Sequence, residues 1–458
     1  MAFSWNDLSP FYSGLQPQAR EALGGLSGAT VYHLAFQLSD PPTQAHGVAE
    51  IYYTNTEGIP LDEIYLALFP NLLGGEMEIV AISANGHSLS PERSSWLLRV
   101  PLSFPLEAGK TVSLHIEFMV TVPSDLQNSY YGILGYNEGI LSFAHGYPTV
   151  LVYNEEGWNN TMPDLDGDPL FADPSFYVVS IDAPAQLTLV TSGVELERSE
   201  KQGRQQVLIA NGPARDFYLC AAPGWQKHSQ VTEAGVQVNL YAPAGLAPDL
   251  IEKSLSFGAS ALDIFSRRYG DYPYTEFDIA PIVTFAGGVE YPGMTAISQE
   301  AFDWGDYLEM ILVHEAAHAW FYNLVGNDTQ DEPWLDEAAA QFATWQYFYD
   351  RYGEEAAEAI RLLDFELRMA TASEPSIPIG LPVAAYTNED YAAIVYGRGP
   401  LFFLALREQM GEETFDRFLR QYVATYAWRT ARAQDFHALA ETVCACDLDS
   451  LFAEWVYP

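Results

Sequence analysis

The pentapeptide His314-Glu315-Ala316-Ala317-His318 lies within residues 307–325, a largely apolar stretch that predicts a helix. Two histidines four residues apart lie one above the other on the same helix face. Both imidazoles can therefore reach one metal ion, at nitrogen–metal distances of about 2.0–2.1 Å for zinc. The glutamate between them borders the ion without binding it, and can take a proton from a water molecule there.

A candidate third ligand, Glu337, follows eighteen intervening residues later, within Trp334-Leu335-Asp336-Glu337-Ala338. We expect Gly326 to end the first helix and Pro333 to open the second, so that the turn returns Glu337 to the histidines. Two histidines and one carboxylate leave a fourth position open for water, as a catalytic zinc site requires. The alternative is two core histidines beside a surface glutamate, and it leaves this spacing unexplained.

The chain changes character near residue 240. Before it, short segments with period-two alternation predict an antiparallel β domain, as at 30–36, 111–118, 176–181 and 206–209. After it, helical patterns dominate, at 248–268, 305–325, 334–351, 354–370, 389–409, 412–427 and 432–457. We therefore expect a multidomain α+β protein, with an N-terminal arm (1–28), an antiparallel β-sandwich (29–228) and an α/β lobe that ends in helices (229–458).

The charge is strongly negative, with 61 acidic and 21 basic residues among 458 and a formal net charge of −40. Such a chain repels nucleic acid and anionic membrane surfaces, so neither is an expected partner. A solvating acidic coat, a field that attracts cationic substrates and adaptation to salt all agree with this composition.

The cysteines and the amino terminus bear on redox state and location. Cys220, Cys444 and Cys446 do not form a disulfide framework by their spacing, and we expect mostly buried structural thiols. No apolar stretch reaches the 18 residues of a membrane span, and Met1 to Trp5 predicts no signal peptide. The protein could be cytoplasmic, or it could be exported with a leader that is absent from this chain. The sequence does not determine the oligomeric state.

The spacing His-Glu-x-x-His, eighteen residues, then Glu resembles the gluzincin aminopeptidases, the family of alanyl aminopeptidase and leukotriene hydrolase. Gly287-Gly288-Val289-Glu290-Tyr291 is similar to that family's Gly-x-Met-Glu-Asn strand. Tyr391 and Tyr396-Gly397-Arg398-Gly399 resemble its Tyr-Glu-Lys-Gly segment, with a second tyrosine five residues earlier. The resemblance implies a thermolysin-like catalytic lobe and one zinc ion per chain.

The resemblance also implies roles for single residues. Glu315 would be the general base, and the Tyr396 hydroxyl would stabilise the oxyanion of the attacked carbonyl. Glu290 would hold the free ammonium of a peptide, and Gly287 and Gly288 would let the backbone approach it. Tyr391 would border the substrate. The implied substrates are peptides with a free amino terminus.

The sequence departs from the family pattern at several places. Asp336 and Ala338 flank the third ligand in place of Asn and Gly, and Tyr291-Pro292 follow the anchor glutamate. The family's N-terminal domain usually supplies a glutamine to the amine site, for which the nearest candidates here are Asn137 and Glu138. Only 62 residues follow Tyr396, too few for the family's large helical C-terminal domain, so we expect an open cleft.

Three functions other than that of an aminopeptidase agree with parts of this sequence. A zinc endopeptidase on the same lobe would cleave peptides with blocked amino termini. A non-catalytic peptide-binding module would have no need of the general base Glu315. Epoxide hydrolysis follows from the family resemblance alone.

Overall fold

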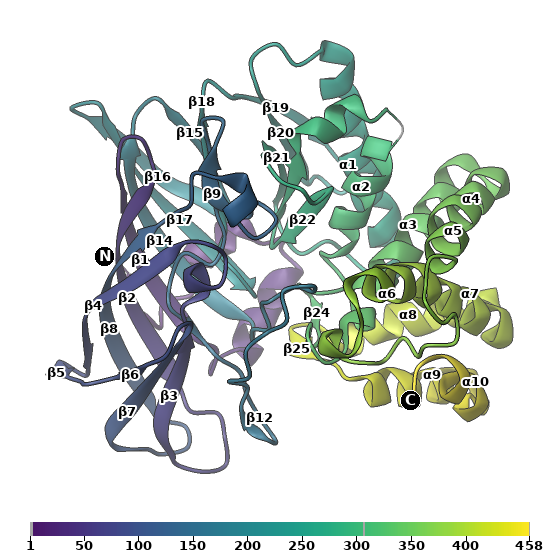
Figure 1. Ribbon diagram of the computed structural model, residues 1–458, viewed down its shortest axis with the longest axis horizontal. Coiled ribbons are helices and arrows are strands. Elements are labelled where there is room, and N and C mark those ends of the chain that lie inside the picture. Colours follow the sequence, from purple (N-terminus) through teal and green to yellow (C-terminus); the bar gives the residue numbers. More distant parts are fainter. Residues whose placement is uncertain (1–2, 306, 458) are drawn as a thin grey trace.

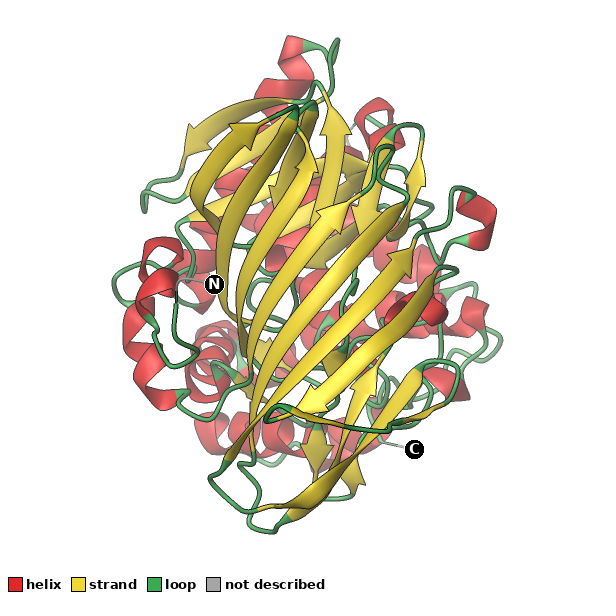
Figure 2. Ribbon diagram, turned by 90° about the vertical axis from the view of Figure 1, so that its left-hand side faces the viewer, coloured by secondary structure: helices red, strands yellow, loops and turns green. Residues whose placement is uncertain are grey.

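The computed structural model describes residues 3–305 and 307–457, in which a β-rich half and a helix-rich half lie side by side (Figure 1). An eight-stranded sheet forms the outer wall of the β-rich half (Figure 2). Its strands, in spatial order, are β16 (Val194–Lys201), β17 (Arg204–Ala214), β14 (Ser175–Pro184), β1 (Val31–Leu38), β2 (Gln44–Thr54), β8 (Thr111–Thr121), β4 (Glu76–Ala84) and β5 (His87–Ser88). Only the β1–β14 pair among these is parallel.

Two four-stranded sheets cover the inner face of this wall. Every second residue of β8 is buried from Val112 to Val120, and this face shares one core with Leu66 and Val100 of a smaller sheet. The small sheets consist of β15 (Leu187–Thr191), β18 (Leu219–Pro223), β10 (Ile140–Phe143) and β9 (Leu134–Asn137), and of β11 (Thr149–Val150), β3 (Leu61–Ala67), β7 (Leu97–Leu106) and β6 (Glu92–Arg93). The layered β-sandwich is as expected.

A five-stranded mixed sheet begins the second half. Its order is β19 (Gln226–Val231), β20 (Gln237–Ala242), β21 (Glu276–Ile282), β23 (Met294–Ser298) and β22 (Gly288–Tyr291). The expected division at residue 228 falls within β19. Strand β22 is the edge strand and runs antiparallel to β23, so its free edge is available to a ligand.

Helices fill the rest of this half. They are α1 (Pro248–Tyr269), α2 (Tyr307–Ala317), α3 (Glu337–Tyr352), α4 (Glu354–Ile360), α5 (Leu367–Met369), α6 (Asn388–Ala393), α7 (Gly399–Met410), α8 (Glu412–Tyr426), α9 (Ala433–Cys444) and α10 (Asp449–Trp455). Two π-helical turns, Arg361–Glu366 and Ile394–Arg398, lie within the helical ranges expected at 354–370 and 389–409, where breaks were allowed for.

The prediction that Gly326 ends the first helix was wrong. Regular α2 ends at Ala317, and His318 lies in the turn that follows. Beyond Ala317 the backbone hydrogen bonds no longer all have the four-residue spacing of an α-helix. Ala319 N–H donates to the carbonyl oxygen of Ala316, three residues back, and Asn323 N–H donates to that of His318, five residues back. Pro333 opens a 3-10 turn, and α3 begins only at Glu337.

The N-terminal arm packs into the junction of the two halves. Its two 3-10 helices, Ser9–Gly14 and Ala19–Gly25, bury Phe11 and Leu23, and Leu15 between them is buried too. Phe11 packs against Phe176 of β14 at 4.8 Å between ring centres. The Leu15 region also pairs with Tyr274 of the second half. The arm therefore belongs to the core and is not peripheral.

The expectation of mostly buried structural thiols was wrong for Cys444 and Cys446. Cys444 and Cys446 form a disulfide, because Ala445 between them adopts a left-handed conformation with φ 51°. Cys220 alone is a buried free thiol. Among the described helices none has the length and apolar character needed to cross a membrane.

Candidate active site

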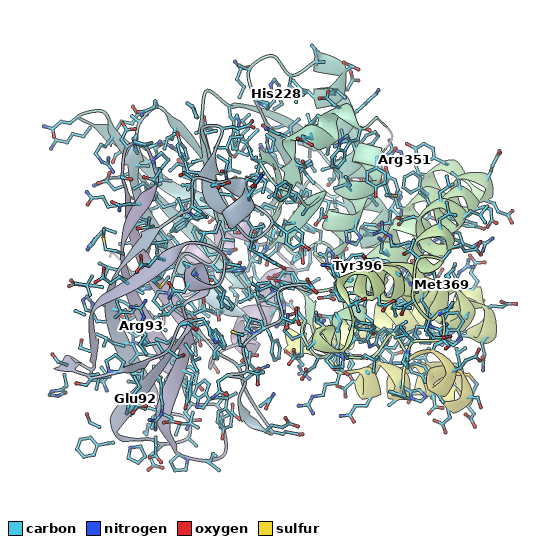
Figure 3. All side chains as sticks on the ribbon, viewed as in Figure 1. Glu92, Arg93, His228, Arg351, Met369 and Tyr396 are labelled. Carbon is cyan, nitrogen blue, oxygen red and sulfur yellow. A yellow bond between two sulfur atoms is a disulfide. The ribbon has the colours of Figure 1, made fainter. Side chains whose placement is uncertain are left out.

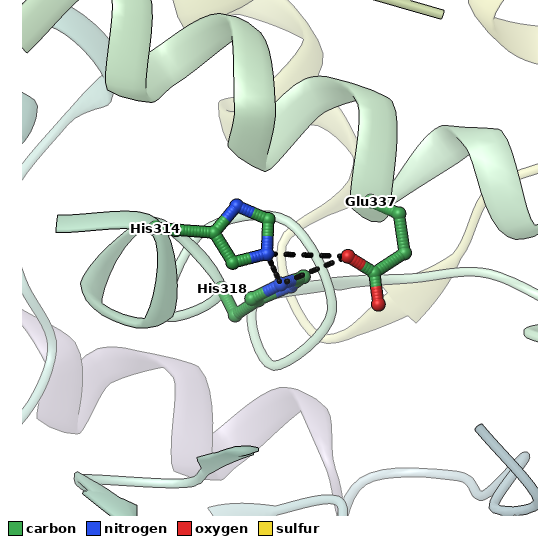
Figure 4. A group of neighbouring side chains, drawn as sticks. All are labelled: His314, His318 and Glu337. Carbon is green, nitrogen blue, oxygen red and sulfur yellow. Dashed lines mark hydrogen bonds and ion pairs between the residues drawn. The ribbon is translucent and has the colours of Figure 1, made fainter. Parts of the chain in front are cut away.

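Three side chains form a compact triangle at the start of α3 and the end of α2. His314 Nε2 lies 3.2 Å from His318 Nε2, and the Glu337 carboxylate oxygen Oε2 lies 3.3 and 3.5 Å from these two nitrogens (Figure 4). A tetrahedral ion with bonds of 2.0–2.1 Å separates its ligand atoms by about 3.3 Å. The triangle therefore fits a zinc ion, and the three predicted ligands are brought together.

Hydrogen bonds to neighbouring residues hold two of these ligands, His318 and Glu337, in place. His318 Nδ1 donates to the carbonyl oxygen of Phe321 at 3.0 Å, which orients the ring so that Nε2 faces the triangle. Asp336 accepts from the backbone N–H of Glu337 at 2.7 Å and caps α3. The aspartate that departs from the family pattern is therefore a helix cap, and it leaves the Glu337 side chain free to face the histidines.

Glu315 is buried beside this triangle. Its carboxylate fits against Gly288 of β22, where an added Cβ would lie 2.7 Å from the carboxylate oxygen Oε1. Glycine at 288 is thus required by the close approach of Glu315. Burial raises the pKa of Glu315 well above its usual value, and the charge of Glu290 adds to this effect.

Glu290 and Asp168 place two carboxyl groups in the adjoining cavity. Side-chain ligand atoms of Glu290, Glu315 and His318 lie within 4.8 Å of one another. Burial raises the pKa of Glu290 to about 7 and that of Asp168 to about 6, and Asp168 contributes to the shift at Glu290. Two half-buried carboxylates that repel each other create a site that favours a cation.

Tyr396 lies where the helix-rich half faces the strands (Figure 3). It is in the π-helical turn Ile394–Arg398, and its ring centre is 6.2 Å from that of His314 and 5.9 Å from that of Tyr391. Burial raises the pKa of Tyr396 well above its usual value, so its hydroxyl stays protonated and can donate. Tyr391 is buried behind it.

Two cavities of about 360 and 400 Å³ meet at the triangle. They share Ala286, Gly288, Glu290, Glu337, Arg368 and Tyr396. The first also has Tyr130, Tyr131, Asp166, Asp168 and Tyr391 in its lining, and the second has Gly287, Trp304, Tyr307, Met310, Glu315 and Gln341.

The candidates Asn137 and Glu138 are not among the described lining residues. Glu138 instead accepts from Gln299 at 2.7 Å on the surface. Sequence reasoning missed Asp168, whose only local signal is the acidic loop Asp164-Leu165-Asp166-Gly167-Asp168. It also missed Arg368, which the sequence presents as one of several arginines on a helix.

Comparison with known proteins agrees with this geometry. Residues 254–455 match the model of the peptidase family M1 domain. Among curated proteins, aminopeptidase M1 of Arabidopsis thaliana is 24% identical over 88% of this chain and 48% of its own length. Endoplasmic reticulum aminopeptidase 1 of Rattus norvegicus is 24% identical over 69% of this chain and 37% of its own length. The chain thus spans half or less of these relatives.

Solved structures cover nearly the whole chain. The M1 zinc metallopeptidase from Deinococcus radiodurans matches with a TM-score of 0.72 and 22% identity, over 94% of this chain and 92% of that one. A mutant of the M1 zinc metallopeptidase from Deinococcus radiodurans bound to a Tyr-Ser-Ala substrate matches with a TM-score of 0.71 and 21% identity, over 94% of both chains.

The fold and the arrangement of His314, His318 and Glu337 are similar to those of the gluzincin metallopeptidases. The match of residues 254–455 to the model of the peptidase family M1 domain supports the resemblance to the gluzincin aminopeptidases. The α+β fold, with a β-rich N-terminal part and a helical C-terminal part, is confirmed as well.

Proposed function

We propose that this chain is a zinc-dependent aminopeptidase that releases amino-terminal residues from peptides. The observation that carries the proposal is the triangle of His314, His318 and Glu337, whose edges of 3.2, 3.3 and 3.5 Å fit one tetrahedral ion. Bound zinc would polarise the scissile carbonyl and lower the pKa of water in its open position.

The protein's own groups would then move the protons. Glu315 accepts the proton of the attacking water and passes it to the leaving amine. Tyr396 donates its hydroxyl hydrogen to the oxygen of the attacked carbonyl. Gly287 lies in the loop before the edge strand β22, and Gly288 is the first residue of that strand. The backbone of both glycines would line the path of the peptide.

Recognition of the free amino terminus is assigned to Glu290 together with Asp168. Both line the first cavity, and their paired negative charge favours an ammonium group. Asp168 would take the place that the family usually gives to a glutamine of the N-terminal domain.

Paired fluorogenic peptides, identical except for an acetylated amino terminus, test the proposal. Each is assayed as purified, after treatment with a zinc chelator, and after zinc is returned. We expect cleavage of the free peptide only, lost with the chelator and restored by zinc. Cleavage of both peptides would favour an endopeptidase with an open cleft. Absence of cleavage across a broad panel would contradict the enzymatic proposal and favour a binding module.

A further inference from the structure

Arg368 lies in α5, directly after the first π-helical turn, and it is the cationic side chain of the two cavities. It lines both of them, and no other arginine or lysine is among the described lining residues. The remaining charged groups there are carboxylates and the ligand His314. A single guanidinium in a strongly acidic cleft provides a place for a negative group of the substrate.

One side of the guanidinium is already held. Its Nη2 donates to the Asp364 carboxylate at 2.7 Å, and its central carbon lies 5.8 Å from the ring centre of Tyr396. Within the described residues, Nη1 makes no hydrogen bond and Nε is buried without an acceptor. Because a guanidinium carries five N–H donors, the Asp364 contact orients Arg368 and leaves donors for a second carboxylate.

The two cavities differ in which part of a substrate they suit. Only the first is lined by Asp166 and Asp168, which together with the shared Glu290 attract an ammonium group and repel an acidic side chain of the first residue. The second holds Glu315, which must face the leaving amine, and Tyr307, which lies close enough to interact with Arg368. The negative group that meets Arg368 therefore belongs on the leaving-group side of the scissile bond.

We infer that Arg368 binds a substrate carboxylate on the leaving-group side, which makes short peptides with a free carboxyl terminus or peptides with an acidic second residue the preferred substrates. The inference rests on the proposed aminopeptidase activity. The subsite would consist of the Arg368 guanidinium and the Tyr396 ring beside it, in the part of the cavity that both residues line.

The test compares peptides that differ only in this charge. Tyr-Ser, Tyr-Ser-Ala and Tyr-Ser-Ala-Ala are each assayed as the free acid and as the amide, and Tyr-Glu-Ala amide is compared with Tyr-Gln-Ala amide. We expect kcat/KM to favour the charged member by about 10-fold in at least one pair, as for a charge-assisted hydrogen bond. A preference in the acid–amide pairs identifies the terminal carboxylate, and one in the Glu–Gln pair identifies the side chain.

Variants assign the preference to this residue. In Arg368→Gln the ratio of kcat/KM for the charged peptide to that for its uncharged partner should fall to about 1. Arg368→Lys should keep part of the preference, because an ammonium group keeps the charge but lacks the two-pronged geometry of a guanidinium. Arg361→Gln is the matched control, since Arg361 pairs with Glu358 at 2.5 Å and is not among the described lining residues. We expect Arg361→Gln to keep the wild-type ratio.

The outcomes separate this inference from the proposed function. Ratios near 1 for every wild-type pair, with zinc-dependent cleavage of free-amine peptides intact, would overturn the inference alone. A ratio that persists in Arg368→Gln, with the unfolding temperature unchanged, would also overturn it. If no free-amine peptide is cleaved, the proposed function itself fails.

Discussion

Glu315 is the residue whose chemical role is most open to a direct test. Glu315→Gln keeps the shape of the side chain and removes its ability to accept a proton. We expect kcat to fall by about 100-fold or more, the range for loss of a general base, while zinc content per chain stays unchanged. Steady-state kinetics and metal analysis of the same preparation check this. Near-normal turnover with full zinc would contradict the assigned role.

Gly288 offers a second test, through the position of Glu315. A Cβ at 288 would lie 2.7 Å from both Cγ and Oε1 of Glu315, so Gly288→Ala must displace the carboxylate. At Gly287 the nearest atom is the flexible end of Ile311, at 3.1 Å. We therefore expect kcat to fall much further in Gly288→Ala than in Gly287→Ala, with similar thermal unfolding. Equal losses in the two variants would show that the Glu315 contact is unimportant.

At the scale of elements, the two π-helical turns determine where Tyr396 and Arg368 point. Gly397 lies in the second turn, and a Cβ there would meet the backbone N of Met369 at 2.6 Å and the carbonyl oxygen of Phe365 at 3.0 Å. The first π segment and α5 therefore pack tightly against the second. Wide helical turns are frequent at functional sites, and here they bring residues of two helices into one cavity.

The loop after β17 connects the two halves through Arg215. This buried guanidinium donates to three carbonyl oxygens, those of Ala172, Asn323 and Arg429, at 2.8, 3.1 and 2.7 Å. Arg215→Met leaves these acceptors unpaired, so we expect a loss of about 2–4 kcal/mol in the free energy of unfolding. Denaturant titration measures it.

Arg204→Met is the matched control for Arg215→Met. Arg204 begins the same strand, pairs with Asp182 and donates to the carbonyl oxygens of Leu38 and Asp182, but its side chain is 34% exposed, so water can replace it. Such pairs contribute about 0–1 kcal/mol, so a small change is expected. Comparable losses in both variants would contradict the structural role given to Arg215.

At the scale of the whole molecule, the net charge of −40 should influence substrate capture. A negative field raises the encounter rate of cationic peptides, and salt screens it over about 8–10 Å at 0.1–0.15 M. We expect kcat/KM for Tyr-Ser-Lys amide to fall several-fold between about 20 and 300 mM salt. Tyr-Ser-Glu amide, with no net charge, should change much less. An equal dependence of kcat/KM on salt for the two peptides would indicate that the acidic surface only solvates the protein.

The sequence by itself predicted the three candidate metal ligands and determined the class of fold. His314 and His318 are placed by helical spacing, which is a local property, and Glu337 by the short connection that follows. Period-two alternation likewise predicted the β-sandwich, because a strand with one buried face must alternate. The amine anchor and Tyr396 were proposed through resemblance to a family, and their roles stay predictions.

Only the tertiary structure decided which distant residues complete the site. Asp168 comes from a loop of the β-rich half and Arg368 from a helix of the other, and no local pattern relates them to Glu290. The regular end of α2, the π-helical turns and the buried N-terminal arm were also missed. Each depends on packing between segments far apart in the chain, which overrides the local preference that a sequence pattern reports.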